Sequence, residues 1–237
     1  MDRTAERGFL DTVEYLHLFR TEGCSTDAMD QAAANGHLDI VKFLHKNRTE
    51  GCRIAMENAC GNGHIDIVRF LHENRTEPCT TRAMDNAAGY GYIRIVRYLH
   101  ENRTEGCTHA AMDNASGDGN LELVMFLHQH RTEGCTQTAM NQAAANGHLK
   151  VVQFLDENRT EGASARAIHD AAANGHLAVV QYLIANRTEG IVCFDALSPS
   201  LMEDSREDML NYLKSQFRQG KMRCQCRLVD PQHCNNV

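Results

Sequence analysis

The stretch NGHLDIVKFLHKNRTEGC, residues 35–52, returns almost unchanged as NGHIDIVRFLHENRTEPC at residues 62–79. Its triplet Arg-Thr-Glu recurs along the chain, starting at Arg20, Arg48, Arg75, Arg103, Arg131, Arg159 and Arg187. Successive copies lie 28 residues apart, except for one step of 27, because a residue is missing between Cys52 and Met56. A fixed internal period of this length indicates a repeat architecture in which each copy is one supersecondary unit.

Residues 25–52 show what one copy is expected to form. The segment opens with Ser-Thr-Asp, three residues typical of helix N-caps, and continues with the alanine-rich AMDQAAAN. Gly36 predicts the end of this first helix, because glycine adopts the left-handed conformation without penalty. A second helix is predicted over about residues 37–47, where the apolar side chains of LDIVKFL form one wide stripe. Neither helix can bury its apolar face alone, so the copies are expected to stack.

The stretch AAANGHLDIVKFL at residues 32–44 fits the pattern A-A-x-x-G-H-L-x-x-V-x-x-L, which residues 143–155 and 171–183 keep almost letter for letter. With this pattern the chain resembles the ankyrin repeats over residues 1–190. Two features depart from that family. The usual Thr-Pro-Leu-His opening is replaced by Asp-Ala-Met-Asp at residues 27–30, and the family's period is about 33 residues. The missing residues fall where ankyrin units project a β-hairpin finger. We therefore predict an all-α, ankyrin-like α-solenoid of stacked helix-turn-helix repeats without β-hairpin fingers.

The domain organisation follows from the repeat register. Residues 1–190 are predicted to form seven units, the first truncated, with the bounds 1–24, 25–52, 53–79, 80–107, 108–135, 136–163 and 164–190. Residues 191–220 are predicted to be a degenerate helix pair that caps the array, with its second helix over 205–217. Residues 221–237 are expected to be a flexible, cysteine-containing tail. Because Met1 aligns with Met29, the chain starts inside a first helix, and we expect it to be a fragment of a longer array.

Bulk composition excludes several classes of function. The net charge of −7 argues against a nucleic-acid-binding surface, which requires a basic face. No apolar run approaches the roughly 18 residues of a membrane span, and the charged first twenty residues hold no signal-peptide core. We therefore expect an intracellular, cytoplasmic protein, with the nucleus left open, and a monomer. No nucleophile–base pair or phosphate-binding loop appears, so no catalytic residue and no cofactor are predicted.

The spacing of the ten cysteines does not indicate a disulfide framework. Five of them hold one repeat position: Cys24, Cys52, Cys79, Cys107 and Cys135. Stacked helices lie roughly 8–10 Å apart, whereas a disulfide requires Cα atoms within about 7 Å. These residues are therefore predicted to be small, buried and reduced.

The end of the chain offers the one candidate metal site. CQCRLVDPQHC contains four zinc-type ligands, Cys224, Cys226, His233 and Cys234. The usual C-x2-C spacing is absent, and the adjacent His233 and Cys234 have difficulty reaching one tetrahedral ion together. We favour a tail with free thiols, and we keep a metal or redox role of this tail as an alternative function.

Two further series of polar residues repeat with the units. The first histidine series follows the turn glycine and comprises His37, His64, His148 and His176. The second histidine series lies in the second helix and comprises His17, His45, His72, His100 and His128. Neighbours in a series lie a whole repeat apart, too far to share a metal, so both series are interpreted as structural. The family resemblance implies that the first series bonds to backbone. The arginine and glutamate of Arg-Thr-Glu are expected to pair between successive loops, each exposed pair contributing roughly 0.2–1 kcal/mol.

Positions where the copies differ are the candidate binding residues. They lie at the starts of the first helices and around the turn glycine: Arg53, Arg82, Tyr90, Tyr92, His109, Asp118, Gln137 and Arg166. Ankyrin-like proteins bind partners on the concave face, so the resemblance implies a non-enzymatic interaction scaffold that binds a protein or peptide there. Surface drift in a duplicated array explains the same variation, and a structural spacer within a longer repeat protein is the other alternative.

Overall fold

A computed structural model describes residues 1–21, 23–77, 79–187 and 207–219. Its helices are α1 (Asp2–Glu6), α2 (Leu10–Phe19), α3 (Asp27–Ala34), α4 (Leu38–Asn47), α5 (Ala55–Gly61), α6 (Ile65–Asn74), α7 (Arg82–Gly89), α8 (Ile93–Asn102), α9 (His109–Gly117), α10 (Leu121–His130), α11 (Gln137–Ala145), α12 (Leu149–Asn158), α13 (Ala165–Ala173), α14 (Leu177–Asn186) and α16 (Glu207–Arg218). Within these ranges there is no strand, and therefore no β-hairpin finger. The predicted class, a solenoid of stacked helix-turn-helix repeats, is confirmed.

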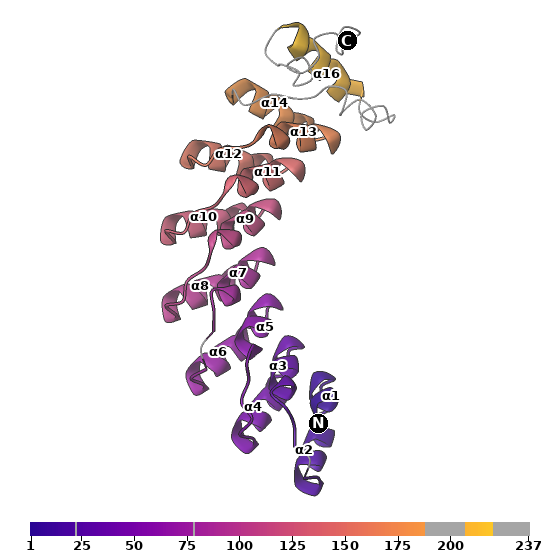
Figure 1. The fold of residues 1–237 in the computed structure, drawn as a ribbon, viewed down its shortest axis with the longest axis vertical. Coiled ribbons are helices and arrows are strands. Elements are labelled where there is room, and N and C mark those ends of the chain that lie inside the picture. The colour runs from indigo at the N-terminus through magenta and orange to yellow at the C-terminus, as the bar shows by residue number, and fades with distance from the viewer. Residues whose placement is uncertain (22, 78, 188–206, 220–237) are drawn as a thin grey trace, which may run out of the picture. The chain divides into compact units, whose positions relative to one another are not determined.

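The chain forms two compact parts, which we call the N-terminal part (residues 1–111 and 131–133) and the C-terminal part (residues 112–130 and 134–237). In the N-terminal part, α1, α3, α5 and α7 pack in succession as one layer (Figure 1). The second helices α2, α4, α6 and α8 follow one another in the same way. In the C-terminal part, α11 packs against α13, and α12 against both α10 and α14. Of the described first helices, six also contact the second helix of their own pair, as α3 contacts α4 and α11 contacts α12.

The core lies between the two layers and uses small residues on one side and large ones on the other. Ala87 and Ala88 of α7 are fully buried, and the small side chains let neighbouring first helices approach closely. Val96 and Leu99 of α8 bring the larger side chains from the second helix. This matches the predicted contrast between an alanine-rich first helix and a second helix with a wide apolar stripe.

The turn between the two helices explains the first histidine series. Gly36 has a φ of 83°, which disfavours any residue with a side chain. A Cβ at Gly36 would also lie 2.7 Å from Cε1 of His64 in the next repeat. That histidine places Nε2 3.1 Å from the carbonyl oxygen of Ala34. His37 contacts the Glu6 carbonyl oxygen in the same way, at 3.1 Å. These two histidines therefore link neighbouring repeats through backbone, as the resemblance implied.

The second histidine series packs on aromatic rings. His45 meets the ring of Phe70 edge-on with centroids 5.4 Å apart, and His128 meets Phe154 at the same distance. In the first of these pairs, Nδ1 of His45 also lies 3.3 Å from Nη1 of Arg75. Such a contact needs the neutral imidazole, whose Nδ1 lone pair can accept from the guanidinium.

The region after the repeats is described only in part. The second helix of the predicted cap is present as α16, where Met209 and Leu213 are buried. The predicted first helix of the cap and the tail with its candidate zinc ligands lie outside the described residues. The division into seven units and the capping role of this region stay predictions.

Candidate binding surface on the first helices

The candidate binding residues lie where the sequence placed them, at helix starts and turns. Seven of the eight are exposed: Arg53, Arg82, Tyr90, His109, Asp118, Gln137 and Arg166. The first four of these belong to the N-terminal part, and the last three belong to the C-terminal part. Their exposure makes them accessible to a partner, although Arg53 and Arg166 also form ion pairs, with Asp27 and Asp170.

Tyr90 and Tyr92 are the two candidates that the structure brings into contact. Their ring centroids lie 6.4 Å apart. Tyr92 is half-buried, because it occupies the place of the turn histidine and its ring covers Gly63 of the preceding repeat, where a Cβ would lie only 2.7 Å from Tyr92 Cε1. Tyr90 is 69% exposed. Of the two rings, Tyr90 is therefore the one that presents its surface to solvent.

A set of acidic side chains in the first helices, which the sequence reasoning missed, holds neighbouring repeats together. Asp85 accepts from the backbone N–H of Thr108 at 2.8 Å and from its hydroxyl at 3.0 Å. Asp113 makes the same two bonds to Thr136. Each bond joins a first helix to the start of the next, where the first backbone N–H groups of a helix lack partners. In the sequence, these residues are recognisable as the acid that follows the repeated methionine. The sequence pattern alone does not distinguish an acid that bonds to the next repeat from one that faces solvent.

The missing residue after Cys52 changes this link in one repeat. No serine or threonine precedes α5, and Asp30 accepts instead from the backbone N–H groups of Arg53 and Ile54, at 3.0 and 3.1 Å. Asp30 is 1% exposed, and its burial raises the pKa of its carboxyl group. The side chain of Arg53 stays at the surface, with Nη2 3.4 Å from Oδ1 of Asp27.

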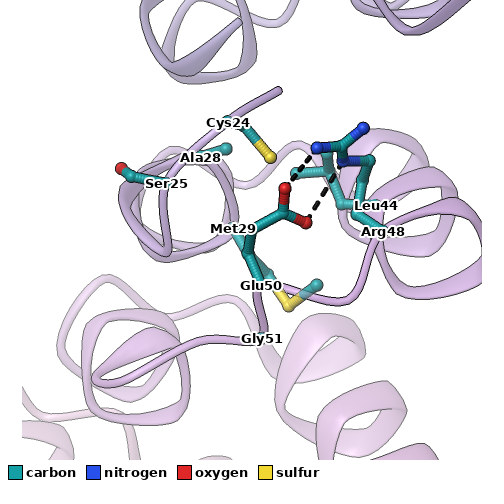
Figure 2. A pocket seen from close by; sticks show the side chains of 8 residues that line it. All are labelled: Cys24, Ser25, Ala28, Met29, Leu44, Arg48, Glu50 and Gly51. Atoms are coloured by element: carbon teal, nitrogen blue, oxygen red, sulfur yellow. Dashed lines mark hydrogen bonds and ion pairs between the residues drawn. The ribbon is translucent and has the colours of Figure 1, made fainter. Parts of the chain in front are cut away.

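The Arg-Thr-Glu loops are built differently from the prediction. Pairing between successive loops was expected, but Arg48 binds Glu50 of its own loop, with Nε 3.2 Å from Oε2 and a second contact through Nη2 (Figure 2). The other described loops repeat this arrangement. Two residues in one turn meet more readily than residues a whole repeat apart. The pair also packs on the preceding repeat, because a Cβ at Gly23 would lie 2.6 Å from Arg48 Nη2.

The cavities beside these pairs are too small for a ligand. Cys24, Met29, Leu44 and Arg48 line one of them, and Figure 2 shows the cysteine sulfur pointing toward the ion pair. Its volume is about 10 Å³, and an equivalent cavity beside Cys52 measures about 20 Å³. A single water needs about 10–15 Å³, whereas small-molecule sites are roughly 300–1,000 Å³.

The cysteines along these loops are poorly reactive. Burial raises the pKa of Cys107 to about 12 and that of Cys52 to about 11. Both side chains are therefore protonated thiols at neutral pH, and the thiolate is the form that attacks or binds metal. Within the described ranges, no three histidine, cysteine or acidic residues gather as a metal site would require. In the same residues, no helix has the length and apolar character needed to cross a bilayer.

The Arg–Glu pairs predict that stability depends on pH in the acid range. The hydrogen bond from Arg48 lowers the pKa of Glu50 to about 2. Burial would raise the pKa of Glu133, but hydrogen bonds from Arg131 and from backbone N–H groups outweigh it and lower this pKa to about 2. A carboxylate whose pKa is lowered by folding contributes its full stabilisation when the pH is above its unfolded pKa of 4.5. This contribution is lost as the pH falls toward the folded pKa. We expect the free energy of unfolding, measured in urea, to fall between about pH 5 and pH 2.

Glu50→Gln should make this fall shallower, because the variant removes one of the titrating groups. Glu157→Gln is the matched control, since it makes the same substitution at an exposed glutamate of α12. Asp30 acts in the opposite direction, because its raised pKa stabilises the fold at low pH. An equal slope in the native chain and in Glu50→Gln would contradict the assignment.

The pairs of stacked helices, joined repeat to repeat by acid–N-cap bonds, define a helical repeat protein of the α-solenoid class. A family model described as ankyrin repeats (3 copies) matches residues 29–113 and again residues 109–193. The chain belongs to the ankyrin repeat family. A comparison with curated proteins found no match.

Proposed function

We propose that the chain is a non-enzymatic interaction module that binds a protein or peptide partner over the exposed side of its first helices. Ankyrin repeats generally mediate protein–protein interactions. One observation supports the choice of surface: the side chains common to the repeats are engaged between them, while the variable ones are exposed. Asp85 and Asp113, for example, accept hydrogen bonds from the next repeat, whereas Arg82 and Tyr90 are exposed.

The small size of the cavities supports the absence of a cofactor from the proposal. Recognition by an extended surface requires no cofactor, and the cavities at the repeat loops hold no more than about one water. We propose a monomeric scaffold that acts in the cytoplasm. Tyr90 is its main aromatic contact, because exposed tyrosine is enriched in interfaces and supplies a large contact area.

Affinity capture from the native cell tests the proposed surface. The double variant Arg82→Ala/Tyr90→Ala is compared with the native chain by quantitative mass spectrometry. The matched control is Arg94→Ala/Tyr15→Ala, which removes an exposed arginine and an exposed tyrosine from second helices of the same part. Unchanged urea unfolding establishes that each variant is folded.

We expect specific partners to be depleted about tenfold or more by the first variant and retained by the control, because aromatic and arginine contacts dominate interface energies. If both variants capture the same proteins at the same level, the proposed surface is wrong. That result would favour the alternative of a spacer within a longer repeat protein.

A further inference from the structure

Amide side chains line the exposed face of three adjacent first helices in the N-terminal part. They occupy two equivalent positions in the repeats, one within the helix and one in the following turn, and we call them the amide face: Gln31, Asn58, Asn86, Asn35 and Asn62. The side chains are exposed or half-exposed. Because α3, α5 and α7 pack side by side, the two positions form rows that cross the helices.

The amide face retains unused hydrogen-bonding capacity. Gln31 and Asn86 form no side-chain hydrogen bond with the described residues. Asn58 donates from Nδ2 to the carbonyl oxygen of Asp30 at 3.1 Å, which leaves its Oδ1 available. An amide offers both a donor and an acceptor, the same complement that a peptide backbone presents. Gly61 of α5 and Gly89 of α7 lie between the two rows. Because glycine has no side chain, the backbone of a bound peptide can approach these two helices closely.

The charges around the amide face are mainly positive. Arg3, Arg7 and Arg82 are exposed and form no ion pair with any described residue. Of the acids on this side, Asp27 lies beside Arg53, and Glu6 is exposed. The acids that follow the repeated methionine are turned toward the next repeat instead.

That orientation is clear at Asp30, Glu57 and Asp85, which accept hydrogen bonds from the start of the following helix. The fold thus withdraws negative charge from this face while the whole chain carries a net charge of −7. A negatively charged ligand would be attracted to the arginines around the amide face and repelled by much of the remaining surface.

We propose, as an extension of the proposed function, that the segment bound on this face is an extended acidic peptide. Its backbone pairs with the amide rows, its carboxylates meet Arg3, Arg7 and Arg82, and Tyr90 packs against its apolar atoms. The spacing fits the polyproline II conformation, whose turn of three residues advances about 9 Å, against roughly 8–10 Å between packed helices. This conformation leaves the backbone donors and acceptors unpaired within the peptide, so those that face the protein are available to the amides.

Fluorescence anisotropy with the full chain tests this inference. The probe is a labelled peptide of four Glu-Pro-Ala triplets, and the reference peptide replaces each Glu by Lys. Three exposed charge pairs predict that the acidic peptide binds about tenfold more tightly than the basic one at low salt. Arg82→Ala and Asn86→Ala should each weaken acidic-peptide binding about threefold. Arg94→Ala, which removes an exposed arginine from α8, should leave it unchanged.

Three results would overturn the inference: equal binding of the two peptides, an equal loss in Arg94→Ala and Arg82→Ala, or no binding of the acidic peptide. A labelled oligothymidine of twelve nucleotides serves as a second polyanion. If it binds as tightly and with the same dependence on Arg82 and Asn86, the face recognises nucleic acid, and the acidic peptide is wrong.

The affinity capture separates failure of this inference from failure of the proposed function. If captured partners depend on Tyr90 and Arg82 but the acidic peptide neither binds nor displaces them, the surface is right and the partner class is wrong. If capture is indifferent to these two residues, the proposed function itself fails.

Discussion

Leu99→Ala is expected to lower the free energy of unfolding by about 3–4 kcal/mol. Leu99 lies in α8 with 2% of its surface exposed and lines a small cavity together with Met84 and Ala83 of α7. The loss combines the transfer free energy of the removed atoms with the cost of the enlarged cavity. Because each repeat is stabilised by its neighbours, a weak repeat also weakens the interfaces on either side of it. Urea unfolding followed by circular dichroism measures the change.

Leu18→Ala is the matched control, because this leucine lies in α2 with 71% of its surface exposed. Its removal should alter the free energy of unfolding by no more than about 0.5 kcal/mol. Equal losses in the two leucine variants would show that the layer between first and second helices is not the stabilising core.

Asp156→Ala is expected to cost about 3 kcal/mol, the second-largest loss, because it removes both an ion pair and a hydrogen bond from a largely buried site. Asp156 binds Nη1 of Arg187 and accepts from the hydroxyl of Tyr182 at 2.9 Å. The side chains of the ion pair are only 16% and 15% exposed. In this repeat an aspartate occupies the position at which His17, His45, His72 and His128 pack against an aromatic ring in other repeats.

The same variant has a spectroscopic signature. Burial and then the hydrogen bond to Asp156 raise the pKa of Tyr182 to about 12. Removing the carboxylate should lower this pKa, which ultraviolet titration of the phenol detects. Glu157→Ala deletes a neighbouring exposed carboxylate and should change neither quantity appreciably. A loss of stability in both variants without a change in the Tyr182 titration would contradict the proposed contacts.

The helices could be predicted from sequence because their signals are local. The predicted second helix at residues 37–47 is present as α4, Leu38–Asn47, since an apolar stripe and the turn glycine define it within one repeat. The fold class followed because the same pattern recurs and each copy needs a neighbour to cover it. The exposure of Arg82 and Tyr90 was likewise implied by their variation between copies.

The acid–N-cap bonds and the pairing of Arg48 could not be predicted in the same way. A carboxylate such as Asp85 can face solvent, a partner or the next repeat, and the side chosen depends on how closely the helices stack. Arg48 and Glu50 were expected to bridge successive loops, but the turn brings them together within one loop.

The sequence by itself determined the repeat, the helix pairs and the need to stack, because periodicity and helix signals act over one unit of the chain. Only the tertiary structure decided which polar side chains join the repeats and which remain at the surface, since that depends on distances between neighbouring units. The amide face of the N-terminal part is an example. Asp30 and Asp85 bond with the next repeat, whereas Arg82 and Asn86 are exposed.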